Sequence, residues 1–174
     1  RVSAKLGGLD PDRPLPMFAR RRFRPLFRRR APAGSGLRGD VLLWPDTFTD
    51  SFHPAVAHAA VEVLEDAGYR VRIPERALCC GLTWVSTGQL STARRMLRRT
   101  ARELAPILRT GVPLVGLEPS CTAVFRSDGP ELLPGDPDVE LLANSTVTLA
   151  ELLDRTAGWH PPDTNRRALV HPDC

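Results

Sequence analysis

From residue 40 onward, short apolar runs alternate with segments in which apolar residues recur every three or four positions. Residues 41–44 are Val, Leu, Leu and Trp, followed by Pro and Asp, and predict a buried strand. Pro54 opens a segment with helical periodicity that runs to Gly68, and residues 71–73 predict a second short strand. This alternation favours an α/β fold with a mainly parallel sheet flanked by helices.

The same alternation continues through the second half of the chain. Gly88 precedes a long helix, with arginines on one face and a core face that comprises Leu90, Ala93, Leu97, Ala101, Leu104 and Leu108. Residues 113–117 predict a third strand, residues 130–145 a loop with a short helix, and the leucines at 149, 152 and 153 a further helix. A Pro-rich connector then leads to residues 168–170, which begin a fourth strand.

The first 39 residues differ in composition, because Arg, Pro and Gly dominate and no regular periodicity is present. We expect a basic linker or docking arm. Its arginines are interleaved with Phe18, Phe23 and Phe27, a pattern that suits RNA or an anionic lipid surface. A solvated connector that packs its aromatic side chains on a neighbouring domain is the favoured interpretation, since Pro25 interrupts any long helix. No nucleic-acid partner is expected.

Charge is concentrated in the same segment. Residues 1–30 carry ten Lys/Arg and two Asp/Glu, a net charge of +8, whereas residues 31–174 carry fourteen and eighteen, a net charge of −4. No apolar stretch reaches the roughly 20 residues that a membrane span needs, and the N-terminus lacks the order of a signal peptide. We expect a cytoplasmic protein, with peripheral contact to the inner face of the membrane through the basic arm as the open alternative.

The candidate chemistry lies in the cysteines. Cys79 and Cys80 are adjacent and precede Gly81, and Cys121 follows the third predicted strand in Glu-Pro-Ser-Cys. Neighbouring cysteines cannot pair with each other without strain, but two thiolates on one loop can bind different atoms of a polynuclear cluster. Gly81 lets the loop bend sharply. The carboxyl ends of parallel strands are where ligands collect, so the fold can bring these cysteines together.

Two other uses of the cysteines remain open. Zinc is the main chemical rival of an iron–sulfur cluster, although it usually has four clearly spaced ligands. A catalytic thiol needs a nearby base, and none of the four histidines has a spacing that assigns it to that role. The catalytic residues are therefore left unassigned.

Together these features resemble the cysteine-rich CCG domain of iron–sulfur oxidoreductases, found in iron–sulfur subunits of glycolate oxidase, lactate utilisation proteins and heterodisulfide reductase. The resemblance covers about residues 40–155 and includes the first strand, the helix ending near Gly68, Cys79-Cys80-Gly81 and the segment that leads to Cys121. More narrowly, residues 44–48 and 117–121 resemble the C-terminal part of fused FAD-linked oxidases.

The resemblance implies that Cys79, Cys80 and Cys121 are ligands of a 4Fe-4S type cluster, and that Cys174 is the first ligand of a second unit. Two positions depart from the family pattern, because Asp46 and Val124 stand where cysteines often lie. The unit could then hold a cluster incompletely, use Asp46 or solvent as a ligand, or serve as a structural partner of the second unit.

We therefore expect three regions: a basic arm (1–39), a complete CCG-type domain (40–157), and a connector with the first strand of a truncated second unit (158–174). The chain begins with Arg1 and stops after an apolar run, which indicates a piece of a longer protein.

The resemblance also implies that the protein passes electrons from FAD-dependent oxidation of a small 2-hydroxy acid, bound elsewhere, to an acceptor. The partners would be a flavin-binding domain or subunit and a ferredoxin-like iron–sulfur domain. FAD is expected in a missing region or partner, because we recognise no glycine-rich dinucleotide fingerprint in the chain. The alternative is a non-catalytic docking or scaffold domain with a vestigial or zinc-binding cysteine site.

Overall fold

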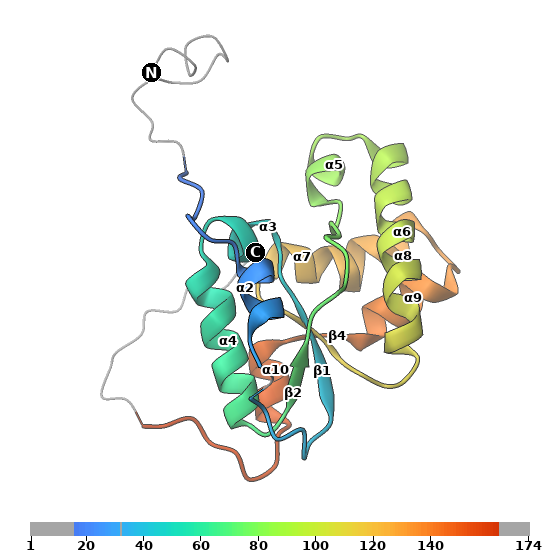
Figure 1. The fold of residues 1–174 in the computed structure, drawn as a ribbon. Coiled ribbons are helices and arrows are strands. Elements are labelled where there is room, and N and C mark those ends of the chain that lie inside the picture. The colour runs from blue at the N-terminus through green and yellow to red at the C-terminus, as the bar shows by residue number, and fades with distance from the viewer. Residues whose placement is uncertain (1–15, 32, 164–174) are drawn as a thin grey trace.

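Four short parallel strands form the centre of the fold (Figure 1). The computed structural model describes residues 16–31 and 33–163. The strands lie in the order β2-β1-β3-β4, and their bounds are β1 Asp40–Trp44, β2 Arg70–Arg72, β3 Leu114–Gly116 and β4 Thr146–Thr148. The register pairs Leu42 of β1 with both Arg72 and Leu114. All carboxyl ends therefore share one edge of the sheet, as the α/β prediction requires, and that prediction is confirmed.

Helices of very different length connect and cover the strands. The longer ones are α2 Phe23–Arg29, α4 Pro54–Asp66, α6 Leu90–Leu108, α9 Pro137–Ser145 and α10 Leu149–Asp154. Single turns occupy the loops at the carboxyl edge and beyond, as α3 Thr47–Ser51, α5 Leu82–Ser86, α7 Pro119–Ala123, the π-helix η1 Val124–Asp128 and α8 Gly129–Leu132. No described helix is both long and apolar enough to cross a bilayer, and α6, the longest, carries five arginines.

The alternation of side chains along β1 divides the core into two clusters, one on each face of the sheet. Leu42 and Trp44 point into a cluster built with α6, α9 and η1, which also contains Cys80 and Cys121. Val41 and Leu43 point into the opposite cluster, built with α2, α4 and α10. All four β1 side chains are at most 1% exposed. The strand is buried on both faces, as its continuous apolar run predicts.

Part of the expected arm lies against the domain itself. α2 packs on α3 and α4, and Phe23 is fully buried. Arg24 is also buried, and its guanidinium donates to the carbonyl oxygens of Pro74 and Arg76 at 2.9 and 3.1 Å. α2 thus contacts the chain just before the cysteine loop. The boundary drawn at residue 39 stays a prediction.

Other predictions have mixed outcomes. The expected helix starts at Pro54 and Gly88 agree with α4 and α6, but the sequence did not indicate β4, which lies between the last two predicted helices. Within α4, Val56 in the first turn is 51% exposed, whereas Ala57, Ala60 and Leu64 are buried. The predicted strand at 168–170, the opening of a second unit and Cys174 lie outside the described residues.

Candidate functional site

The thiols that the sequence places 41 residues apart meet at the carboxyl edge of the sheet. Cys80 lies in the loop after β2, and Cys121 lies in α7 after β3, so β1 separates the two strands that carry them. Their Sγ atoms are 3.0 Å apart, and both residues are buried. Cys79 is half-buried beside them. The structure thus brings together all three described cysteines that the sequence singles out.

A glycine shapes the loop that carries Cys79 and Cys80. Gly81 has φ +92°, a left-handed conformation that residues with a Cβ adopt at a cost, and it begins α5. Its backbone N–H donates to the Sγ of Cys79 at 3.4 Å. The chain therefore reverses immediately after Cys80, which keeps the two sulfurs on one tight loop.

Two polar side chains that sequence reasoning missed hold the cysteine backbone in place. Thr100, on the buried face of α6, donates from its hydroxyl to the carbonyl oxygen of Cys79 at 2.9 Å. Glu118 accepts from the backbone N–H of Cys121 at 2.7 Å and caps α7. A threonine within an apolar helix face and a Glu-Pro pair before a helix are the signals that could have indicated these roles.

The environment favours protonated thiols when no metal is bound. The hydrogen bond with Cys121, with burial adding to it, raises the pKa of the Cys80 thiol to about 12. The hydrogen bond with Cys80, and then burial, raise the pKa of the Cys79 thiol above its ordinary range. A metal that binds here would have to displace these protons, because the thiolate is the form that ligates.

A buried donor without a partner lies in the same cluster. The indole Nε1 of Trp44 has no hydrogen-bond partner among the described residues, although Trp44 is only 1% exposed. Trp44 ends β1, packs edge-on against Phe125 at 4.9 Å between ring centroids, and shares its apolar cluster with Cys80 and Cys121. Sulfur atoms of an iron–sulfur cluster accept such hydrogen bonds. The orphan N–H and the three soft sulfur donors both fit a thiolate-bound cluster.

The arrangement is nevertheless not a finished metal site. Two thiolates on one tetrahedral ion with bonds of about 2.3 Å lie about 3.8 Å apart, so Cys80 and Cys121 would have to separate when they bind. Within residues 16–31 and 33–163, no group of three or more His, Cys, Asp or Glu side chains has a metal-binding arrangement. The chemistry of the donors fits a cluster, and further ligands are needed.

The two positions that depart from the family pattern do not supply those ligands. Both carboxylate oxygens of Asp46 already accept hydrogen bonds, one from the N–H groups of Phe48 and Thr49 and the other from the Thr49 hydroxyl. Asp46 thus caps α3. Val124 is 1% exposed in the apolar core.

One glycine-rich segment has the spacing of a dinucleotide fingerprint, although the sequence prediction counted none. Residues 34–39 read Gly-Ser-Gly-Leu-Arg-Gly. They precede β1 instead of joining a strand to a helix, so they lack the helix N-terminus that would bind a pyrophosphate. A Cβ on Gly34 would lie 2.1 Å from the carbonyl oxygen of Tyr69, so the close approach of the two backbones requires a glycine at this position.

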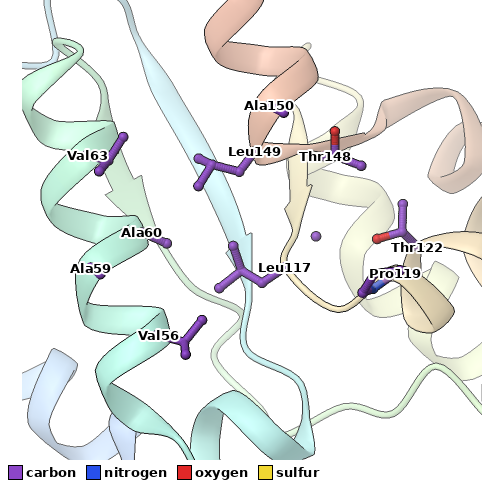
Figure 2. A pocket seen from close by; sticks show the side chains of 11 residues that line it. Val56, Ala59, Ala60, Val63, Leu117, Pro119, Thr122, Thr148, Leu149 and Ala150 are labelled. Carbon is purple, nitrogen blue, oxygen red and sulfur yellow. The ribbon is translucent and has the colours of Figure 1, made fainter. Parts of the chain in front are cut away.

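A separate apolar pocket of about 580 Å³ opens on the other face of the sheet. Figure 2 shows Val56 and Ala60 of α4 facing Leu117 and Leu149 across it. Its walls also include Ala59, Val63, Gly116, Pro119, Thr122, Thr148 and Ala150. No Lys or Arg lines it, so it lacks the positive group that the carboxylate of a 2-hydroxy acid would pair with.

Comparison with known proteins agrees with this geometry. Residues 46–126 match the family described as CCG, cysteine-rich domain, a range that contains all three clustered thiols. The chain is 29% identical over 140 residues to lactate utilization protein A of Bacillus velezensis and 30% identical over 141 residues to that of Shouchella clausii. It is 24% identical over 129 residues to one of the subunits of the anaerobic glycerol-3-phosphate dehydrogenase of Escherichia coli K12.

These alignments include most of this chain but only part of each relative. They cover 77%, 78% and 74% of the chain, and 57%, 57% and 33% of the respective relatives. No solved structure matches significantly. The chain therefore spans little more than half the length of the lactate utilization proteins that it matches.

Proposed function

Because residues 46–126 match the CCG cysteine-rich domain family, we propose that this chain carries an iron–sulfur site within a flavin-linked oxidoreductase. The site would pass electrons from FAD-dependent oxidation of a 2-hydroxy acid of the glycolate or D-lactate type to an acceptor. The observation that carries the proposal is the buried Cys80–Cys121 pair, 3.0 Å apart, with Cys79 on the same loop. The similarity to lactate utilization protein A supports this substrate class.

In this proposal Cys79, Cys80 and Cys121 hold a cluster of the 4Fe-4S type, which takes up and releases single electrons when bound. Burial of Cys80 and Cys121 keeps water away from the sulfurs. The Trp44 N–H would donate to a sulfur of the site. Cys174 would serve a second unit, and ligands beyond the three thiols would come from another chain or solvent.

Flavin and substrate belong elsewhere in this scheme. The apolar pocket lacks a cation for the substrate carboxylate, and the glycines before β1 do not open a helix. FAD would therefore be held by another domain or subunit, with a ferredoxin-like domain as a further electron carrier. We place the protein in the cytoplasm.

A second candidate function is a docking or scaffold domain whose cysteines are vestigial or bind zinc. The specific observations in its favour are that Asp46 is engaged in capping α3 and that Val124 is packed in the core. Only three thiols then remain in the described region. This alternative predicts a colourless folded protein, either free of metal or with zinc and no sulfide.

The test is anaerobic reconstitution with iron and sulfide, followed by measurement of iron, acid-labile sulfide, zinc and visible absorbance. We expect iron and sulfide in the unaltered chain and a loss of at least tenfold in Cys80→Ser and Cys121→Ser. Cys174→Ser is the matched control and should keep the metal of this unit. Circular dichroism would show that each variant is folded.

Each other outcome assigns the site differently. A folded, metal-free chain would transfer redox chemistry to other parts of the protein and support the scaffold alternative. Zinc without sulfide would establish the zinc site. Loss of iron in Cys174→Ser alone would place the cluster outside this unit.

A further inference from the structure

A strongly basic surface lies beside α2, at the end of the sheet where the thiols meet. Residues 16–30 contain seven arginines and no acidic residue. The backbone N–H of Ala19 donates to the carbonyl oxygen of Ser51 in α3 at 2.8 Å, which fixes this segment to the carboxyl edge of the sheet. Its placement is therefore defined by the fold, and the arginines are presented from a fixed backbone.

Three of the seven arginines are used internally. Arg24 is buried against backbone carbonyls, Arg28 donates to the carbonyl oxygen of Glu75, and Arg30 forms a bidentate pair with Glu65 at 2.9 and 2.5 Å. The other four are exposed and form no ion pair with any residue in the described parts of the chain. They are Arg20, Arg21, Arg22 and Arg29, and they line a surface hollow of about 720 Å³.

Exposed aromatic side chains border this hollow. Phe18, which lines it, is 74% exposed and stacks on Phe52 with ring centroids 4.7 Å apart. Phe48 is 57% exposed, and its ring centroid lies 6.0 Å from that of Phe52. Met17 next to Phe18 is 83% exposed. Large apolar side chains held at the surface next to unpaired cations are typical of an interaction site.

The arginines of α6 provide a comparison within the same molecule. Arg95, Arg99 and Arg102 are also exposed and make no ion pair with a described residue. The same helix, α6, also carries an acidic residue, Glu103. The exposed large apolar side chain of α6 is Leu90, in its first turn. Exposed arginines therefore occur both on α6 and beside α2, but the surface beside α2 combines them with exposed aromatic rings.

We propose that this surface, formed by Phe18, Phe48, Arg20, Arg21, Arg22 and Arg29 and here called the basic aromatic surface, binds anionic phospholipid membranes peripherally. Guanidinium groups pair with lipid phosphates in a bidentate manner, and exposed aromatic rings enter the headgroup boundary. Residues 31–174 carry a net charge of −4, so the rest of the chain adds no net attraction to an anionic bilayer, and the attraction is concentrated in the basic segment. An RNA base could stack on Phe18, but RNA would leave the neighbouring exposed Met17 without an apolar partner.

The test is sedimentation of the full chain with vesicles of phosphatidylcholine alone or with about 30% phosphatidylglycerol, a composition in which lipid charge is substantial. The chain should bind the anionic vesicles only, and less at higher salt. Arg20→Gln/Arg21→Gln/Arg22→Gln should weaken binding at least tenfold. The matched control Arg95→Gln/Arg99→Gln/Arg102→Gln removes the same charge from α6 and should stay within twofold of the unaltered chain.

A second variant separates membrane insertion from simple charge attraction. Phe18→Ser keeps every charge, and it should weaken vesicle binding severalfold both at low salt and at moderate salt. No vesicle binding, equal binding to neutral vesicles, or equal loss in the two arginine variants would overturn the proposal. RNA binding that depends on the same arginines, without vesicle binding, would assign the surface to nucleic acid. None of these measurements requires a metal cluster, so they are independent of the function proposed above.

Discussion

Replacement of Phe23 by alanine tests whether α2 is part of the folded domain or only the end of a connector. Phe23 is fully buried, lies edge-on to the ring of His58 at 4.9 Å between centroids, and contacts Phe27 at 5.3 Å. It shares an apolar cluster with Val41 and Leu43 of the central strand. Removing a phenyl ring from such a site costs about 3–5 kcal/mol, from the lost burial and the cavity that remains.

The expected effect is large relative to the whole stability of a domain, which is about 5–15 kcal/mol. For a chain of this size each kcal/mol lowers the melting temperature by about 2–4 °C, so Phe23→Ala should lower it by about 6–20 °C. Calorimetry or circular dichroism on heating would measure the shift. Phe18→Ala is the matched control, since Phe18 is 74% exposed, and it should change stability by about 0.5 kcal/mol or less.

If Phe23→Ala and Phe18→Ala melted within about 2 °C of each other, the burial of Phe23 would contribute little and the reasoning from the cavity cost would be refuted. Residues before 39 would then behave as a linker, as their composition predicts. A large shift in Phe23→Ala alone would instead make α2 an element of the domain, and a fragment that starts at residue 40 would be unstable.

Two further predictions concern hydrogen bonds, one at the site and one between the end of α2 and α4. Thr100→Val should lower the free energy of unfolding by about 1–2 kcal/mol, because the buried carbonyl of Cys79 loses its donor. Urea denaturation would measure this change. The control is Thr87→Val, whose hydroxyl is exposed, and an effect of Thr100→Val no larger than that of the control would contradict the prediction. Arg30→Gln should lower stability by about 1 kcal/mol at pH 7, because the hydrogen bond from Arg30 lowers the pKa of Glu65 in the folded state. A carboxylate whose folded pKa is depressed contributes its stability above the ordinary value of 4.5 and loses it as the pH falls through the folded pKa. The difference between Arg30→Gln and the unaltered chain should therefore shrink on acidification below 4.5, and a difference that did not depend on pH would exclude this cause.

The elements with strong periodicity were predictable from the sequence. The apolar face of α6 recurs at helical spacing along the helix, and the apolar run of β1 has the length of a strand and is closed by Pro45. β4 was not predictable, because its three residues Thr146, Val147 and Thr148 form a strand only where β3 offers a parallel edge to pair with. Tertiary context decides such a short segment.

The candidate site was predictable only in part, for a related reason. Adjacent cysteines before a glycine indicate the chemistry, and strand ends indicate the place. The residues around the thiols are recruited from distant parts of the chain by packing, among them Thr100 from α6 and Trp44 from β1. Nothing in the local sequence distinguishes a threonine that holds the cysteine loop from one that faces solvent. The burial of Arg24, in a segment whose composition predicts solvation, is a further example.

The separation of Cys80 and Cys121 onto strands on opposite sides of β1 has a consequence for biogenesis. The two sulfurs become neighbours only after β2 and β3 have both paired with β1, so the unfolded chain contains no preformed pair. Loading of any ion or cluster that binds both thiols is therefore coupled to assembly of the sheet. Such a ligand would stabilise the assembled sheet, and a variant that weakens the pairing of β2 or β3 with β1 would bind it less tightly.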